Sequence, residues 1–242
     1  MAVSGTMASV AGCVDDVEED DVQETDDVDE ADDTEEAVDE ADDVDEVADD
    51  DADETDDDVE AEEPEYGTFE TYEFSGQGDT VESGVFVTNL VEVRAEHDGQ
   101  SNFIVHLVDD DRSHLFVNEI GQYDGTVAEI MDADEYLLDV EADGNWSVEI
   151  AELWADRGYD LPISESGTGP TLLGPYEFTG SHVATSSHDG ESNFIVRVMP
   201  EFGFPTLLAN EIGQYDGQTT FNVDEPAWIA IEADGSWSIE IE

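Results

Sequence analysis

Polar side chains that suit ligand binding occur twice in this chain, about 91 residues apart. The first set is Asp98, Asn102, Asn118, Glu119, Gln122, Tyr123 and Asp124, and the second is Asp189, Asn193, Asn210, Glu211, Gln214, Tyr215 and Asp216. Loop carboxylates and amides are hard oxygen ligands of the kind that Ca²⁺ prefers. One interpretation is therefore a pair of equivalent ligand sites, with Ca²⁺ as a candidate cofactor. The other is structural, because Asx and Gly residues form turns, and Asn and Glu satisfy backbone groups at strand ends.

Two of the five histidines, His97 and His188, also recur at matching positions. A zinc site needs three or four ligands, but His106 has Arg197 as its counterpart, and His114 and His182 have no counterparts in the other set. We therefore expect the recurring histidines to cap turns or to pack, and we assign no metal site. The chain has no Gly-x-Ser-x-Gly elbow, no phosphate-binding glycine loop and no His-Glu-x-x-His motif. The sequence thus predicts a protein that is not an enzyme.

These residues belong to an internal repeat, which sets the organisation of the chain. Residues 97–105 recur as 188–196, residues 118–125 recur unchanged as 210–217, and residues 141–150 recur as 232–241 with two differences. The spacing predicts a first unit at 66–152 and a second at 170–242, joined by a linker at 153–169.

Within each unit, apolar and polar residues alternate with a period of two. Examples are Phe103–Leu107, Leu138–Val140 and Trp146–Ile150. This period, with β-branched and aromatic residues, is typical of half-buried antiparallel strands. Turn residues stand between the runs, at 97–99, 109–111, 123–125 and 143–144. The pattern predicts an all-β fold of two tandem small antiparallel β-sandwich domains, either jelly-roll or Ig-like.

Each unit is expected to bury its own apolar set and to fold as a separate domain. The set is Phe103, Val105, Leu138, Val140, Trp146 and Ile150 in the first unit, and Phe194, Val196, Ile229, Ile231, Trp237 and Ile241 in the second.

Charge is very unevenly balanced in this chain. It has 69 Asp and Glu residues, four Arg and no Lys, for a formal net charge of −65. This charge excludes nucleic-acid binding through a basic patch and direct attraction to an anionic membrane surface. Residues 14–65 hold 33 of the acids and no aromatic residue, so the sequence predicts a disordered, extended acidic linker there. The other 36 acids lie in 66–242. The loss of Lys with an excess of Asp and Glu resembles the proteins of salt-in haloarchaea.

The N-terminal head, residues 1–13, ends in Val10-Ala11-Gly12-Cys13, which resembles the lipobox where prokaryotic lipoproteins are cut and lipidated. Cys13 is the only cysteine, and the acidic linker follows it at once. The resemblance implies a truncated signal, a lipid on Cys13 and an extracellular, membrane-anchored protein. A disordered N-terminus with a free thiol is the alternative. No apolar run reaches about 18 residues, so we expect membrane contact only through the lipid.

Three strand patterns point to a family. The Gly-x-Ser-Asn-Phe-x-Val, Leu-Leu-Asp-Val and Asp-Gly-x-Trp strands resemble pre-peptidase C-terminal type domains of prokaryotic extracellular proteins. The resemblance implies an accessory, non-catalytic surface module. We therefore expect a non-enzymatic cell-surface module that binds glycan, protein or cation. A hydrolase-associated accessory module and a pure structural spacer are the alternatives.

Overall fold

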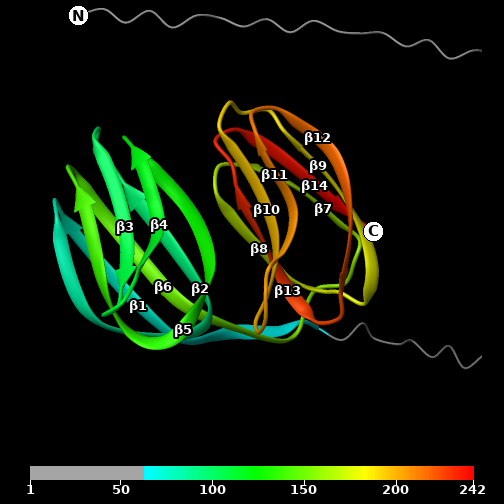
Figure 1. Ribbon diagram of the computed structural model, residues 1–242, viewed down its shortest axis with the longest axis horizontal. Coiled ribbons are helices and arrows are strands. Elements are labelled where there is room, and N and C mark those ends of the chain that lie inside the picture. The colour runs from blue at the N-terminus through cyan, green and yellow to red at the C-terminus, as the bar shows by residue number, and fades with distance from the viewer. Residues whose placement is uncertain (1–62) are drawn as a thin grey trace, which may run out of the picture. The chain divides into compact units, whose positions relative to one another are not determined.

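The computed structural model describes residues 63–242 (Figure 1). This part of the chain has fourteen strands and no helix, so none of it forms a helix that could cross a membrane. The first six strands are β1 (Glu65–Gln77), β2 (Thr80–His97), β3 (Asn102–Val108), β4 (Ser113–Ile120), β5 (Tyr123–Ala142) and β6 (Asn145–Arg157). The other eight are β7 (Ile163–Thr168), β8 (Thr171–Glu177), β9 (Gly180–His188), β10 (Asn193–Pro200), β11 (Thr206–Ile212), β12 (Tyr215–Val223), β13 (Pro226–Glu232) and β14 (Ser236–Ile241). The head with Cys13, and nearly all of the acidic linker, lie outside the described residues.

The strands form three antiparallel sheets. The first half of the described chain contributes one six-stranded sheet in the order β1-β6-β2-β5-β3-β4. The second half contributes two four-stranded sheets, β12-β9-β14-β7 and β11-β10-β13-β8. The all-β prediction is confirmed, and the antiparallel sheets are consistent with a β-sandwich.

The two halves share one strand order, because β2 and β5 of the first half each correspond to two strands of the second. β1-β6-β2-β5 matches β7-β14-β9-β12, and β2-β5-β3-β4 matches β8-β13-β10-β11. The division falls at a residue with positive φ. Gly180 (φ 83°) begins β9, and at the equivalent position Asn89 (φ 53°) marks a register shift within β2. Glycine and asparagine are the residues that tolerate this left-handed conformation most readily.

Alternation along the strands builds a separate apolar core in each half. The cluster in the first half contains all six residues that were predicted there, including Phe103 and Trp146. The cluster in the second half likewise contains its predicted six, including Phe194 and Trp237. A third cluster, which the sequence did not predict, joins the halves. It consists of Leu90, Ala128, Ala151, Leu153, Met199, Trp228 and Ala230.

Three of the four predicted turns lie between strands, but the turn at 123–125 is wrong. β5 begins at Tyr123, and the chain reverses at Gly121 and Gln122, where Gly121 has a φ of 96°. Asp-Gly in that segment is therefore strand, because the glycine two residues before Tyr123 already makes the turn. The segment expected as a linker, 153–169, contains the end of β6 and all of β7, and β7 pairs with β14.

Candidate binding site

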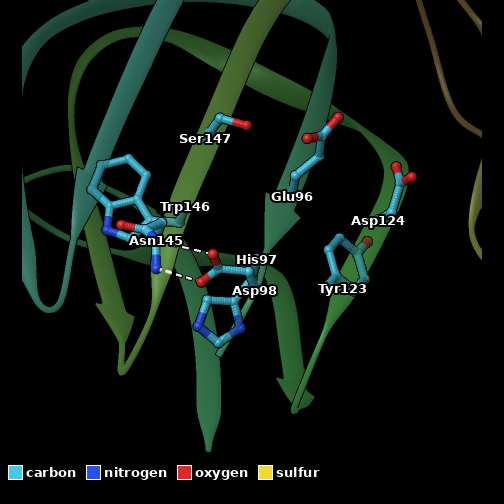
Figure 2. Close-up of a pocket in the computed structure, with 8 residues that line it drawn as sticks. All are labelled: Glu96, His97, Asp98, Tyr123, Asp124, Asn145, Trp146 and Ser147. Carbon is cyan, nitrogen blue, oxygen red and sulfur yellow. Dashed lines mark hydrogen bonds between the residues drawn. The ribbon is translucent and has the colours of Figure 1, made fainter. Parts of the chain in front are cut away.

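Asp98, the first predicted site residue, follows β2 and secures the adjacent hairpin. Its carboxylate accepts hydrogen bonds from the Asn145 backbone N–H at 2.7 Å and from Asn145 Nδ2 at 2.8 Å (Figure 2). These bonds, the side-chain bond first, lower the pKa of Asp98. In the second half, Asp189 accepts from the Ser236 backbone N–H at 2.7 Å. Both aspartates therefore have a structural role in a turn.

Beside Asp98 the surface is hollowed into a pocket of about 330 Å³. Its lining residues are Glu96, His97, Asp98, Tyr123, Asp124, Asn145, Trp146 and Ser147 (Figure 2). They come from the ends of β2 and the starts of β5 and β6, which are neighbours in the six-stranded sheet. Burial, the largest cause, and nearby carboxylates raise the pKa of Tyr123, so its phenol stays protonated. Of the predicted residues only Asp98, Tyr123 and Asp124 reach this pocket.

Two of the lining residues that the sequence did not single out distinguish the first half from the second. Ser187 is the equivalent of Glu96, because each pairs with the matching serine of the neighbouring strand, and Ser236 is the equivalent of Asn145. Glu96 lies opposite Ser147, whereas Ser187 Oγ and Ser238 Oγ hydrogen-bond each other at 2.7 Å. The change from Asn145 to Ser236 is one of the two differences between residues 141–150 and 232–241, but it was not linked to a site. The change from Glu96 to Ser187 lies just before the compared segment 97–105.

His97 fastens the turn that precedes β5. Its ring stacks on Phe103 with centroids 4.5 Å apart, and Nδ1 donates to the Gly121 carbonyl at 2.7 Å. The side chain is fully buried. In the second half, His188 stacks on Phe194 at 4.8 Å and bonds the Gly213 carbonyl at 2.9 Å. Both histidines therefore pack and cap a turn, as predicted.

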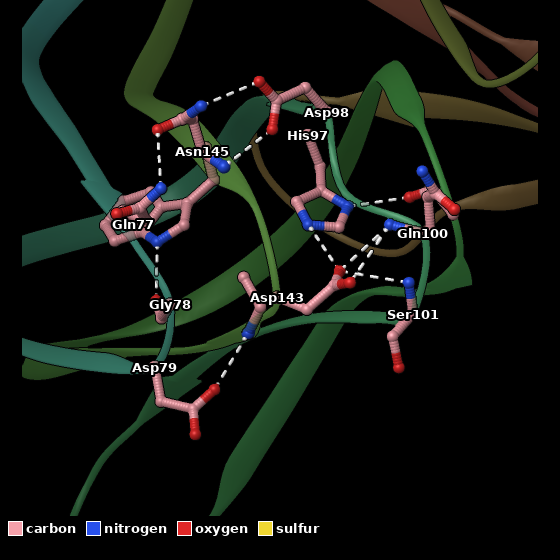
Figure 3. Close-up of polar contacts among 12 residues, drawn as sticks. Gln77, Gly78, Asp79, His97, Asp98, Gln100, Ser101, Asp143 and Asn145 are labelled. Atoms are coloured by element: carbon pink, nitrogen blue, oxygen red, sulfur yellow. Dashed lines mark hydrogen bonds and ion pairs between the residues drawn. The ribbon is translucent and has the colours of Figure 1, made fainter.

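Asp143 completes this turn from the hairpin between β5 and β6 (Figure 3). It accepts backbone hydrogen bonds from Ser101 at 3.0 Å and Gln100 at 3.1 Å, and Oδ1 lies 3.4 Å from His97 Nε2. The backbone hydrogen bonds, with that from Ser101 first, lower the pKa of Asp143. Asp234 repeats the arrangement in the second half. The sequence showed Asp143 only as a turn residue.

The other predicted residues around the β4–β5 and β11–β12 connections lie exposed together with Asp124 and Asp216 and with an isoleucine that was not predicted as a site residue. We call this segment the repeated strip. Its members are Asn118, Glu119, Ile120, Gln122 and Asp124, and their identical counterparts Asn210, Glu211, Ile212, Gln214 and Asp216. All are exposed, and among residues 63–242 their side chains make no hydrogen bond or ion pair. Asn102 and Asn193, at the starts of β3 and β10, are also exposed. The fold does not explain why the strip is identical in both halves.

The described part of the chain has no preformed metal site. Between residues 63 and 242, no three His, Cys, Asp or Glu side chains gather closely enough to hold an ion. The carboxylates of Asp98 and Asp143 are instead engaged with backbone N–H groups.

Comparison with known proteins gives little. No family model matches the chain, and no curated protein matches it. Among solved structures, a crystal structure of the PBSX exported protein XepA is similar over 73% of this chain and 86% of that chain. The identity is 8% and the TM-score 0.25, which is too weak to carry an argument about fold or function.

Proposed function

We propose that this chain is a non-enzymatic binding module made of two tandem jelly-roll sandwiches, and that the pocket of the first half binds a neutral glycan. The shared strand order supports the tandem arrangement. Two four-stranded antiparallel sheets in the order β7-β14-β9-β12 and β8-β13-β10-β11 correspond to an eight-stranded jelly roll.

The chemistry of the pocket carries the proposal. Glu96 and Asp124 are exposed acceptors, and Ser147 can both donate and accept, so together they suit the hydroxyl groups of a sugar. Tyr123, which is half-buried, adds aromatic surface that suits the apolar face of a sugar ring, whereas Trp146 belongs to the core beneath the pocket. Anionic ligands are disfavoured because Glu96, Asp98 and Asp124 would repel them.

Residues of the second half supply a matched test. Glu96→Ser and Asn145→Ser give the pocket the side chains that the second half has. We expect glycan-array screening of the full chain in molar salt, with and without Ca²⁺, to find a neutral glycan. Calorimetry should then show at least about tenfold weaker binding by the double variant. Glu135→Ser, which removes an exposed acid outside the pocket, is the control. A chain that binds no glycan, or binds equally well after the double substitution, would contradict the proposal.

The proposed setting is the cell surface of a halophile. The lipobox-like head supports a lipid on Cys13, and the charge of residues 14–65 supports a disordered tether. Mass spectrometry of the membrane fraction should find a mature chain that begins with a lipidated Cys13. An intact Met1 peptide from the cytosol would contradict this.

A second candidate function is protein binding by the repeated strip. It is favoured by five pairs of identical exposed residues whose side chains make no hydrogen bond or ion pair within the described chain. A photo-crosslinker at Gln122 or Gln214 should capture the same partner in producing cells, and Ile120→Asp with Ile212→Asp should abolish capture. If neither position captures a protein, a spacer role becomes the better reading.

A further inference from the structure

One outer sheet face of the second half is buried against the first half. Met199, Trp228 and Ala230 on this face are 0%, 3% and 4% exposed. They pack in the third cluster against Leu90, Ala128, Ala151 and Leu153 of the first half. The outer face of the sheet β8-β13-β10-β11 in the second half therefore covers the face of the first half that corresponds to the other sheet, β7-β14-β9-β12. We call this arrangement front-to-back stacking.

The equivalent face of the first half is uncovered. Strand register gives the equivalent positions: Val81 for Leu172, Val108 for Met199, Leu137 for Trp228, and Asp139 for Ala230. Leu137 is 44% and Val81 61% exposed. The same face continues to the edge strand β4, where Leu115 is 51% and Ile120 79% exposed. We call the face formed by Val81, Val108, Leu115, Ile120 and Leu137 the front face.

We infer that the front face docks the front face of a second copy of this chain, giving a two-fold symmetric dimer. Val81, Val108 and Leu137 match residues that pack in the third cluster of the second half, whereas Leu115 and Ile120 match Leu207 and Ile212, which are equally exposed. Together the five residues form an exposed apolar patch of the kind that marks an interaction site. A self-complementary patch on both subunits is the common route to a closed dimer.

A second copy could also dock its front face on the back face, which is the face of each half that corresponds to the one covered in the first half. The residues at that face argue against this. In the first half this face includes Leu90, Ala128 and Ala151, and the chain's own second half already covers it. In the second half the equivalent positions carry Ser181, Thr220 and Glu242, and the exposed Val183 lies beside them on β9. A front face therefore finds a mostly polar back face on another copy, and a second front face is the better apolar match.

Charge on the front face is compatible with this pairing. His106 is the cross-strand neighbour of Asp139, and Arg112 pairs with Asp132 at one end of the face. A two-fold axis can set His106 of one copy against Asp139 of the other. The remaining repulsion between two chains of charge −65 is screened by salt, because the Debye length falls to about 3 Å at 1 M. The dimer should therefore tighten as salt rises.

Sedimentation equilibrium on the full chain tests the inference, from about 1 to about 500 µM protein and from about 0.2 to about 2 M NaCl. We expect a monomer–dimer equilibrium that shifts toward dimer with salt. Leu137→Asp should weaken the dimer by at least about tenfold, since it places an unpaired charge in the interface. Val183→Asp, at a 38% exposed valine on β9, should leave the dimer unchanged.

Every other result overturns the inference. A chain that stays monomeric at all concentrations overturns the inference, whether the front face is open or covered by another segment of the chain. A dimer that Leu137→Asp leaves intact, or one that Val183→Asp disrupts instead, places the interface elsewhere. Open-ended oligomers would indicate front-to-back stacking. Val81→Asp serves as a second variant should Leu137→Asp fail to give the native circular dichroism spectrum.

Discussion

Trp146 lies across Gly76 of the neighbouring strand, so closely that a β-carbon on Gly76 would come within 2.6 Å of the indole Cζ2. The indole N–H also donates to the Gly78 carbonyl at 2.9 Å. Trp237 and Gly167 have the same relationship in the second half, again at 2.6 Å. Glycine in a strand interior often marks such a close approach. The pair closes one end of each apolar core, next to the proposed glycan pocket in the first half.

Substitution of this glycine should be costly. We expect Gly76→Ala to reduce the free energy of unfolding by about 1–3 kcal/mol, because the new methyl group must displace a buried indole. Chemical denaturation monitored by tryptophan fluorescence measures it. Gly67→Ala is the matched control, since its β-carbon would meet the partly exposed Trp154 only at 3.2 Å. Equal effects at the two glycines would mean that Trp146 moves aside without strain.

The third apolar cluster should couple the unfolding of the two halves. We expect the unaltered chain to unfold in one transition, although the repeat alone predicted independent domains. Trp228→Ala should destabilise the chain by about 3–5 kcal/mol and separate the transitions, because Trp228 is the largest residue of the shared cluster. Differential scanning calorimetry in molar salt distinguishes these outcomes, and Trp154→Ala is the control outside the three clusters. Two transitions in the unaltered chain would show that the cluster does not couple the halves.

Alternation and repetition predicted most of what lies within each half. Residues such as Phe103 and Trp146 identify core strands, because side chains that alternate with a period of two place every apolar residue on the same face. The contact between the halves was hidden because Leu90 and Trp228 occupy outward positions of their strands, and their burial depends on a surface distant in sequence. The turn was predicted at 123–125 because Asp-Gly is a common turn pair. The chain instead turns at Gly121, and the sequence does not show that this glycine adopts a positive φ.

The candidate site was only partly predictable, for a related reason. Asp98, His97 and Asn118 are all repeated, yet the side chains of the first two hold the turn while the side chain of Asn118 makes no hydrogen bond within the described chain. Glu96 and Asn145 line the pocket but differ between the repeats, so a search for repeated residues passed over them. Residues shared by both halves serve the fold that both halves have, so residues that differ between the halves are the better guide to a site that only one half has.

Acid should weaken the turn that Asp143 secures. Its folded-state pKa is below the usual value of about 3.9, so its contribution to stability is complete above that value. The contribution is lost as the pH falls through the lowered pKa, because the carboxylate then binds a proton. Asp143→Asn should therefore lower the melting temperature at pH 7, and its difference from the unaltered chain should shrink below about pH 4. Asp216→Asn is the control, since that carboxylate accepts no hydrogen bond within the described chain. A difference that does not change with pH would assign the effect to shape alone.

Salt should stabilise the globular part, because residues 66–242 carry 36 acids against four arginines. Burial and the nearby Glu149 raise the pKa of Glu92, which is one local sign of this crowding. In dilute buffer the carboxylates repel over long distances, whereas at about 1 M salt the Debye length is about 3 Å. We expect loosening below about 1 M NaCl and a melting temperature that rises with salt, both followed by circular dichroism. Arg94→Gln, which removes the partner of Glu96 at 3.6 Å, should destabilise the chain more at low salt than at high salt. A native spectrum and an unchanged melting temperature in dilute buffer would remove the physical basis for the halophilic setting.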